Sequence, residues 1–373
     1  MKTIFINALS ALQGGGQTYL INLFKYRPKG GYKIYLLAHK RNKEIFLEFQ
    51  DDDFEILEFS LASGNIIQRV LFEKFKLPNI LKKLQIDIYY APGGIMNIKV
   101  PKNCKSVVAF RNMLPLQKDA YTRYLLFSYM RFRIFLLRYI FINSFKKSDK
   151  VIFISKYAQE VIKQYIPKIE DKSIVIYHGL NEIFLNEITN NDLDIKLDYY
   201  LYVSILDVYK SQIELVRSWK ILKDSYGIKE KLLLIGPMYK PYGNKVLNEI
   251  QKLNLQDDVI YLGTISYNEL PKYYQKAKAL IFASICENCP NILLEKMASK
   301  KMIFCSSHQP MPEFGKDSVV YFDPVDENDL VKQILKYSDE KQKDKYEIKA
   351  YNNALEYDWK KTSKKTFEFL LGN

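Results

Sequence analysis

A buried strand that leads through a short loop into a helix is the feature that most constrains this 373-residue chain. The apolar run 279–282 predicts the strand, and Pro290 and Asn291 are residue types that commonly begin a helix. Apolar residues then recur at helical spacing. We therefore expect Glu287 on a loop at the carboxyl end of a strand, and Glu295 one turn into the following helix.

This arrangement suits a ligand that carries phosphate groups flanked by hydroxyls. A helix N-terminus offers N–H groups and a positive dipole end, which both favour phosphate. Open α/β sheets bind ligands at the carboxyl ends of their strands, and carboxylates there can accept hydrogen bonds from sugar hydroxyls. Two glutamates near a helix start are also common on protein surfaces, and these residues alone leave that interpretation equally open.

The amino-acid pattern of this segment is more specific than the general arguments from helix dipoles and strand ends. Glu287 and Glu295 are separated by seven residues that include Cys-Pro-Asn-Ile-Leu-Leu. This pattern resembles the donor-site signature of retaining glycosyltransferases of family 4, glycosyl transferases group 1, which have the GT-B fold. The resemblance implies that Glu287 contacts the sugar hydroxyls and Glu295 the nucleotide ribose. It also implies contacts to phosphate and sugar from the residues between them, namely Cys289, Pro290, Asn291 and Ile292.

The resemblance extends over nearly the whole chain and sets the expected fold class. Strands and helices alternate as in an α/β protein, and 373 residues can supply two cores. The GT-B fold implies two Rossmann-like domains that face each other across a cleft, with a C-terminal helix that crosses back to the first. We expect an acceptor-side domain at 1–184, a linker at 185–198, a donor domain at 199–355 and the crossover helix at 356–373.

Composition limits the partners and the compartment. The formal charge of +14 suits an acidic partner such as nucleic acid, an anionic membrane or a phosphorylated substrate. Four cysteines do not make a disulfide framework in a chain of this length. The apolar run at the N-terminus is too short for a signal peptide, and every window of 18 residues contains charge. These features predict a cytoplasmic protein.

Three cysteines and a histidine have the spacing of a zinc site: Cys286, Cys289, Cys305 and His308. The competing interpretation places Cys305 in a buried strand and Cys289 in the donor loop. Four ligands would then require the strand to leave its sheet. We therefore expect no metal.

A glycine run near the N-terminus has the order strand, loop, helix. The run 14–16 follows a predicted strand and precedes a helical pattern, which is a phosphate-cradle arrangement or a plain flexible turn. It resembles the N-terminal glycine loop of the same family, which implies that Gly15 and Gly16 lie near the donor.

Lys210 follows the first predicted strand of the second domain. The resemblance implies that its ammonium stabilises the leaving diphosphate. Family members usually have Gly-Arg where this chain has Ser204-Ile205, and a glycine where it has Ser211. One of two expected cations is therefore missing, and Arg111 or Lys240 could compensate.

Two further sites are expected at strand ends of the first domain. Arg111 and Asn112 follow an apolar strand and begin the pattern Arg-Asn-Met-x-Pro. This pattern is similar to one in a subset of family 4 enzymes, which implies that both residues lie on the acceptor side. The alternative is an arginine that is ion-paired at a strand end. His178 precedes Gly179 and could contact donor phosphate or act as an acid or base, although a structural histidine at the domain junction is the favoured interpretation.

Residues 121–145 predict one long helix, because they contain neither glycine nor proline. One face is predicted to point toward the core: Tyr124, Leu125, Ser128, Phe132, Phe135, Leu136 and Tyr139. The other face mixes basic and large apolar residues, which suits a lipid headgroup layer or burial against protein, including a dimer partner. The residues assigned to membrane contact are Arg123, Arg131, Arg138, Phe127 and Leu137.

Together these features predict a retaining, metal-independent hexosyltransferase without a cofactor. Its catalytic residues would be Glu287 and Lys210. It would move a sugar from a nucleotide-diphosphate sugar to a glycan or lipid-linked acceptor in bacterial surface polysaccharide or lipopolysaccharide synthesis, on the inner face of the cell membrane. The alternatives are a sugar-nucleotide epimerase of the same architecture and a basic nucleic-acid-binding protein. No nucleic-acid-binding motif supports the last, so we expect no nucleic acid partner.

Overall fold

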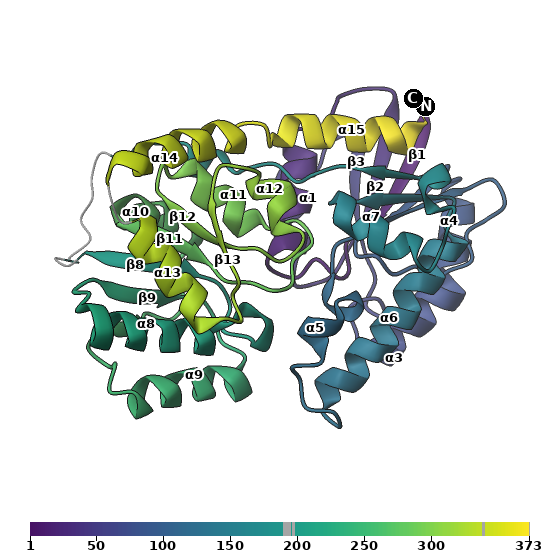
Figure 1. The fold of residues 1–373 in the computed structure, drawn as a ribbon. Helices are drawn as coiled ribbons and strands as arrows, with labels where there is room; N and C mark the ends of the chain where they lie inside the picture. The colour runs from purple at the N-terminus through teal and green to yellow at the C-terminus, as the bar shows by residue number, and fades with distance from the viewer. Residues whose placement is uncertain (189–194, 196–197, 338–339, 373) are drawn as a thin grey trace. The chain divides into compact units, whose positions relative to one another are not determined.

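The computed structural model describes residues 1–188, 195, 198–337 and 340–372 (Figure 1). The chain divides into two compact units. The first comprises Met1–Leu116, Phe132–Gly179 and Asp358–Asn373, and the second comprises Gln117–Arg131 and Leu180–Tyr357. Eight residues of the predicted linker 185–198 lie outside the described residues.

The first unit contains a seven-stranded parallel sheet. Its strands are almost wholly apolar because helices cover both faces of such a sheet. The strand order β3-β2-β1-β4-β5-β6-β7 is that of a Rossmann-like sheet. The strands are β1 Lys2–Asn7, β2 Tyr32–Ala38, β3 Phe54–Glu58, β4 Ile88–Ala91, β5 Lys105–Phe110, β6 Lys150–Phe153 and β7 Ser173–Val175.

The helices of the first unit follow the strands in alternation. Ser155, expected to cap a helix, accepts a hydrogen bond from the Ala158 N–H group at 3.1 Å and begins α7. The helices are α1 Gly15–Lys25, α2 Lys43–Phe46, α3 Ile66–Leu71, the π-helical turn η2 Phe72–Lys76, α4 Leu77–Lys83, α6 Tyr129–Lys147, α7 Lys156–Lys163 and α15 Trp359–Leu371, with 3-10 turns η1 Leu47–Phe49, η3 Leu114–Leu116 and η4 Ile169–Lys172.

The last helix, α15, packs into the core of the first unit beside α1 (Figure 1). Trp359 and Phe367 are buried there together with Leu23. The Ser363 hydroxyl donates a hydrogen bond of 2.8 Å to the Leu23 carbonyl. A C-terminal helix that returns to the first unit was expected from the resemblance to GT-B enzymes.

The second unit has a six-stranded parallel sheet in the order β10-β9-β8-β11-β12-β13. Trp219 lies fully buried in its core. The strands are β8 Tyr199–Val203, β9 Lys231–Ile235, β10 Val259–Tyr261, β11 Ala279–Phe282, β12 Ile303–Ser306 and β13 Val320–Phe322. The helices are α5 Lys118–Tyr121, α8 Gln212–Tyr226, α9 Lys240–Lys252, α10 Leu270–Lys276, α11 Asn291–Ala298, α12 Met311–Gly315, α13 Glu327–Tyr337 and α14 Glu340–Ala354, with 3-10 turns η5 Glu182–Phe184, η6 Val208–Lys210 and η7 Tyr267–Glu269. Two parallel Rossmann-like sheets confirm the predicted α/β fold class.

The predicted helix 121–145 is wrong in its extent and in its buried face. The helix α5 ends at Tyr121, and α6 begins only at Tyr129. Phe135, assigned to the core, is 69% exposed, whereas Phe141 on the other face is buried. Both faces carry large apolar residues, so periodicity could not decide between them. The deciding contact is with the sheet, where the ring of Phe141 packs on Phe110 of β5 with centroids 5.5 Å apart.

No helix within the described ranges combines the length and the apolar character needed to cross a membrane.

Candidate active site

The central strands β8 and β11 lie side by side in the second sheet, and their carboxyl ends carry two of the predicted site residues. Lys210 ends the turn η6 that follows β8, and Glu287 lies on the loop after β11. The Lys210 ammonium and the Glu287 carboxylate form an ion pair, with side chains 7% and 17% exposed. The sequence-predicted catalytic pair is thus brought together.

The loop that carries Lys210 is held by backbone and side-chain hydrogen bonds. The Tyr202 hydroxyl donates to the Lys210 carbonyl at 2.8 Å, and the Lys210 N–H donates to the Asp207 carbonyl at 2.9 Å. The Asp207 carboxylate accepts from the Tyr124 hydroxyl at 2.9 Å and from the Val208 N–H at 2.8 Å. Burial raises the pKa of Asp207 above its ordinary value. These contacts hold the backbone that carries the lysine side chain.

Ser211, where the resemblance implied a glycine, has a backbone conformation that favours glycine. Its φ of 52° and ψ of 35° lie in the left-handed region, where a side chain costs about 1–2 kcal/mol. The residue begins α8 and is fully buried. The chain therefore makes a left-handed turn after Lys210 with a serine instead of a glycine.

Arg123, assigned to membrane contact, reaches this same segment. Its Nη1 donates to Glu214 Oε1 at 2.7 Å and to the Val208 carbonyl at 3.2 Å, and lies 3.5 Å from the Ser211 hydroxyl. Arg123 thus adds a positive charge beside the loop that carries Lys210. No local pattern indicates this contact, because its partners lie 85, 88 and 91 residues away in the sequence.

The other residues assigned to membrane contact differ in their surroundings. Arg131 donates to the Tyr121 carbonyl at 2.7 Å, and Arg138 donates to the Tyr165 hydroxyl at 2.5 Å. Phe127 is 97% exposed, and Leu137 is half-buried. The exposed apolar surface of this region is therefore larger than predicted, while the arginines contact their own chain.

Glu295, the second glutamate of the signature, lies in a buried tyrosine pocket. The Tyr267 hydroxyl donates to Glu295 Oε1 at 2.8 Å, and the Tyr274 hydroxyl lies 3.5 Å from Oε2. Phe184 packs on both tyrosine rings. Burial raises the pKa of Glu295 to about 7, against the opposing effect of the tyrosine hydrogen bonds. The carboxyl group is thus set to change its charge near neutral pH.

The residues between the two glutamates form the start of α11. Pro290 occupies the N-cap and provides no side-chain cap. The Asn291 N–H donates to the Cys289 carbonyl at 2.9 Å, and Asn291 and Ile292 are half-buried in the first turn. The positive end of the helix therefore lies between Glu287 and Glu295 in the chain.

Lys296 is a buried cation that the sequence analysis missed. Its side chain is fully buried, and its Nζ finds no hydrogen-bond partner among the described residues. The rings of Tyr202, Tyr274 and Phe282 surround it at 5.9, 5.0 and 5.9 Å. Burial lowers the pKa of Lys296 to about 7. Its position three residues after the buried Leu293 was a usable signal.

The glycine run of the first unit takes the predicted place at the start of a helix. Gly14 is the N-cap of α1 with a φ of 63°, a conformation that favours glycine. Gly15 and Gly16 form the first turn, and no side chain caps it. Their predicted contact with the donor stays a prediction.

Arg111 lies over the ring of Tyr19, with its guanidinium carbon 3.2 Å from the ring centroid. Its Nε and Nη2 are buried and find no hydrogen-bond partner within the described ranges, which also contain no ion pair to this arginine. The ring of His178 stacks between Tyr19 and Trp359, at 5.4 and 5.3 Å. The exposed Asn112 accepts from the backbone N–H two residues on. Arg111 thus offers unused donors to an anion.

Two family models match the chain in succession. The model described as Glycosyltransferase Family 4 matches residues 13–182, and the model described as Glycosyl transferases group 1 matches residues 186–354. The chain is a group 1 glycosyltransferase of the family 4 type.

Three relatives illustrate the range of proteins to which this glycosyltransferase is similar. It is 25% identical over 352 residues to the N-acetylgalactosamine-N,N'-diacetylbacillosaminyl-diphospho-undecaprenol 4-alpha-N-acetylgalactosaminyltransferase of Campylobacter jejuni, covering 91% of this chain and 92% of that one. It is 25% identical to an O-antigen chain mannosyltransferase of Salmonella typhimurium over 51% of each chain. The solved structure of Anabaena HepE in complex with UDP-glucose shares the fold, with a TM-score of 0.76, 15% identity and full coverage of both chains.

The four residues with the spacing of a zinc site are Cys286, Cys289, Cys305 and His308, and in this glycosyltransferase they do not form a group that could hold a metal ion. Cys305 lies in β12, as the competing interpretation expected. No group of three or more His, Cys, Asp or Glu side chains that could hold a metal ion is present in the part of the chain that the structure describes.

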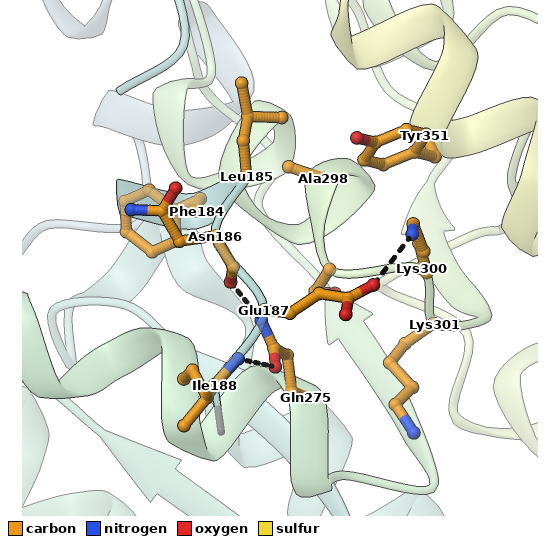
Figure 2. A pocket seen from close by; sticks show the side chains of 11 residues that line it. Phe184, Leu185, Asn186, Glu187, Ile188, Gln275, Ala298, Lys300, Lys301 and Tyr351 are labelled. Carbon is orange, nitrogen blue, oxygen red and sulfur yellow. Dashed lines mark hydrogen bonds and ion pairs between the residues drawn. The ribbon is translucent and has the colours of Figure 1, made fainter. Parts of the chain in front are cut away.

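A polar cavity of about 340 Å³ in the second unit contains none of the predicted site residues (Figure 2). Gln275 anchors the chain beside it, because its amide donates to the Asn186 carbonyl at 2.9 Å and accepts from the Ile188 N–H at 3.2 Å. Lys300 Nζ lies 3.6 Å from the Glu187 carboxylate. In the glycosyltransferase this cavity marks where residues 184–188 attach to the second unit.

Proposed function

We propose that this glycosyltransferase moves a hexose from a nucleotide-diphosphate sugar to a lipid-linked glycan, with retention of the anomeric configuration. The observation that carries the proposal is the Lys210–Glu287 ion pair at the ends of β8 and β11, with Glu295 in its tyrosine pocket on the next helix.

Donor binding would use each of these groups differently. Glu295 accepts hydrogen bonds from the ribose hydroxyls, since a buried carboxylate gains most from donors that replace water. The Lys210 ammonium turns from Glu287 to the diphosphate, and the first turn of α11 adds its dipole. Glu287 then accepts hydrogen bonds from the sugar hydroxyls and fixes the ring for transfer.

The reaction would need no protein nucleophile. The acceptor hydroxyl attacks the anomeric carbon on the side from which the diphosphate leaves, so the carbon–oxygen bond to diphosphate breaks as the bond to the acceptor forms. A diphosphate oxygen takes the proton of that hydroxyl. Lys210 stabilises the charge that develops on the leaving group, which is the work a metal ion would otherwise do. We expect turnover to persist in EDTA.

The names of relatives and the exposed apolar surface of the chain support a proposal for the acceptor and for the location of the enzyme. Two relatives are named for a diphospho-undecaprenol substrate and for an O-antigen chain. Large apolar side chains are exposed between residues 125 and 139, among them Phe127, Phe132 and Phe135. Exposed rings on a chain of charge +14 suit a peripheral position on the inner face of the cell membrane. The product would belong to surface polysaccharide or lipopolysaccharide synthesis.

A thermal-shift panel of nucleotide diphosphates, followed by slow-hydrolysis assays with the matching sugars, tests the donor site. Glu295→Ala should lose nucleotide affinity, whereas Glu287→Ala should keep it and lose mainly turnover. Full activity in both variants would contradict the proposal. Conversion of the free nucleotide sugar to its epimer would identify an epimerase instead.

A further inference from the structure

The first unit contains a cavity of about 900 Å³ that the proposed reaction does not use. We call it the α3–α6 groove, because α3 with its continuation η2 lines one side and α6 the other, with residues 96–100 as a third wall. Figure 1 labels both helices in this part of the unit. Its apolar lining consists of Val70, Phe75, Met96, Ile98, Val100 and Ile140.

The groove is preformed, because its third wall is bound to α6. The Met96 N–H donates to the Ser144 hydroxyl at 3.0 Å. Gly94 has a φ of 84°, and a Cβ there would lie 2.9 Å from the ring of Phe141, so only glycine lets the loop approach the helix so closely. A cavity of this volume with fixed walls matches the size of small-molecule sites.

Three lysines in the lining give the groove a strong positive charge. Lys74, Lys99 and Lys147 are exposed, and no ion pair to any of them is found in the described ranges. The single acidic residue in the segments 64–83, 94–105 and 129–148 is Glu73. That carboxylate is buried and is paired with Arg69 at 3.2 Å, so it does not neutralise the lysines.

The apolar lining continues onto the surface along both helices. Ile67 on α3 precedes Val70 by three residues, and Phe132 on α6 precedes Ile140 by eight, so each pair shares a helix face. Ile67 is 66% exposed and Phe132 is 62% exposed. A charged groove with an exposed apolar approach is the surface that an amphiphile with an anionic head recognises.

We propose that the α3–α6 groove binds the acceptor as a single-chain lipid phosphate, with the hydrocarbon chain against the apolar lining and the phosphate on the three lysines. Ammonium groups on flexible stems suit phosphate as point charges and do not impose a fixed geometry. This inference rests on the proposed function, because it gives the lipid-linked acceptor a place in the first unit, apart from the donor residues of the second.

Binding of geranylgeranyl phosphate to the full chain, measured by calorimetry below its aggregation limit, tests the inference. Geranylgeraniol and inorganic phosphate are the two halves of the probe and should each bind at least tenfold more weakly. The double variant Lys74→Glu/Lys147→Glu and the single variant Val70→Glu should each lose at least tenfold in affinity. Lys146→Glu is the matched control, because Lys146 is exposed on α6 but does not line the groove, and it should stay within twofold.

Three results would overturn the inference. One is an equal loss in Lys146→Glu and in the double variant, which would indicate general attraction by net charge. Another is unchanged affinity for the probe in Val70→Glu and in the double variant. The third is variants that keep the probe but lose binding to anionic vesicles, which would make the surface a membrane contact alone. Nucleotide-induced thermal shifts should persist in every variant, so failure of the donor site appears separately, as a wild type that responds to no nucleotide.

Discussion

The buried Lys296 allows a quantitative test of the second unit. An ammonium with no hydrogen-bond partner in the described part of the chain, surrounded by three aromatic rings, should cost stability. Lowering its pKa from 10.5 to about 7 costs about 4 kcal/mol at pH 7, where half of the folded molecules have lost the proton. Lys296→Met keeps the length of the chain and removes the charge, so we expect it to raise the free energy of unfolding by about 2–4 kcal/mol at pH 7.

The pH dependence gives this prediction its sign. Between pH 7 and 10.5 the unfolded lysine keeps its proton and the folded one does not, so wild-type stability gains up to about 1.4 kcal/mol per pH unit from this group. The advantage of Lys296→Met should therefore shrink by about 2 kcal/mol from pH 7 to 8.5. Burial also raises the pKa of the neighbouring Glu295 to about 7, while Lys296 opposes that rise, so Glu295 titrates within this window and does so differently in the two proteins. Both proteins should therefore carry Glu295→Gln, so that the remaining titrating groups cancel in the difference.

Chemical denaturation at pH 7, 7.75 and 8.5 measures the effect. Lys300→Met is the matched control, because the Lys300 side chain is 55% exposed. The free energy of unfolding of this variant should stay within about 0.5 kcal/mol of wild type. A methionine variant that is less stable than wild type, or an advantage that does not change with pH, would refute the reasoning.

The remaining predictions concern residues of the candidate active site. Lys210→Ala should lower turnover by at least a hundredfold in a sugar-transfer assay, because the leaving diphosphate loses its cation, whereas Lys252→Ala, at an exposed lysine of the same unit, should change it less than twofold. Nucleotide affinity measured by calorimetry should rise from pH 6 to 8, because Glu295 must be ionised to accept ribose hydroxyls; the dependence should vanish in Glu295→Gln, and a steep dependence in that variant would assign it to another group. Ser211→Gly should stabilise the protein by about 1 kcal/mol in a denaturant titration by relieving the left-handed backbone, and a lower midpoint would mean that the buried hydroxyl contributes more.

The local structure of residues 279–298 was predictable because local rules determine it. An apolar strand, a proline at the helix start and helical spacing place Glu287 and Glu295 with no knowledge of distant residues. The assignment of Glu287 and Lys210 to one site came from the family resemblance, and their ion pair was not predicted. No spacing rule links residues 77 positions apart, and the sheet brings them together through the neighbouring strands β8 and β11.

The segment 117–139 was not predictable, because it depends on tertiary contacts. Its apolar residues fall on both faces of a helix, so the period alone allows either face to be buried. The packing of Phe141 on Phe110 determines which face of α6 is buried. The hydrogen bond from Arg123 to Glu214 connects residues 117–131 to the second unit. These partners lie 31 and 91 residues away in the sequence, beyond the reach of a local pattern.

The place of α15 has a consequence for how this protein is made. A ribosome releases the seven strands of the first unit early, yet Trp359 and Phe367, which complete the core around Leu23, emerge only after the second unit has been synthesised. During the intervening translation the nascent unit exposes an apolar surface that α15 will later cover. The portion synthesised first is therefore the last to reach its final packing, and a message truncated before codon 359 would yield a product that is prone to aggregate.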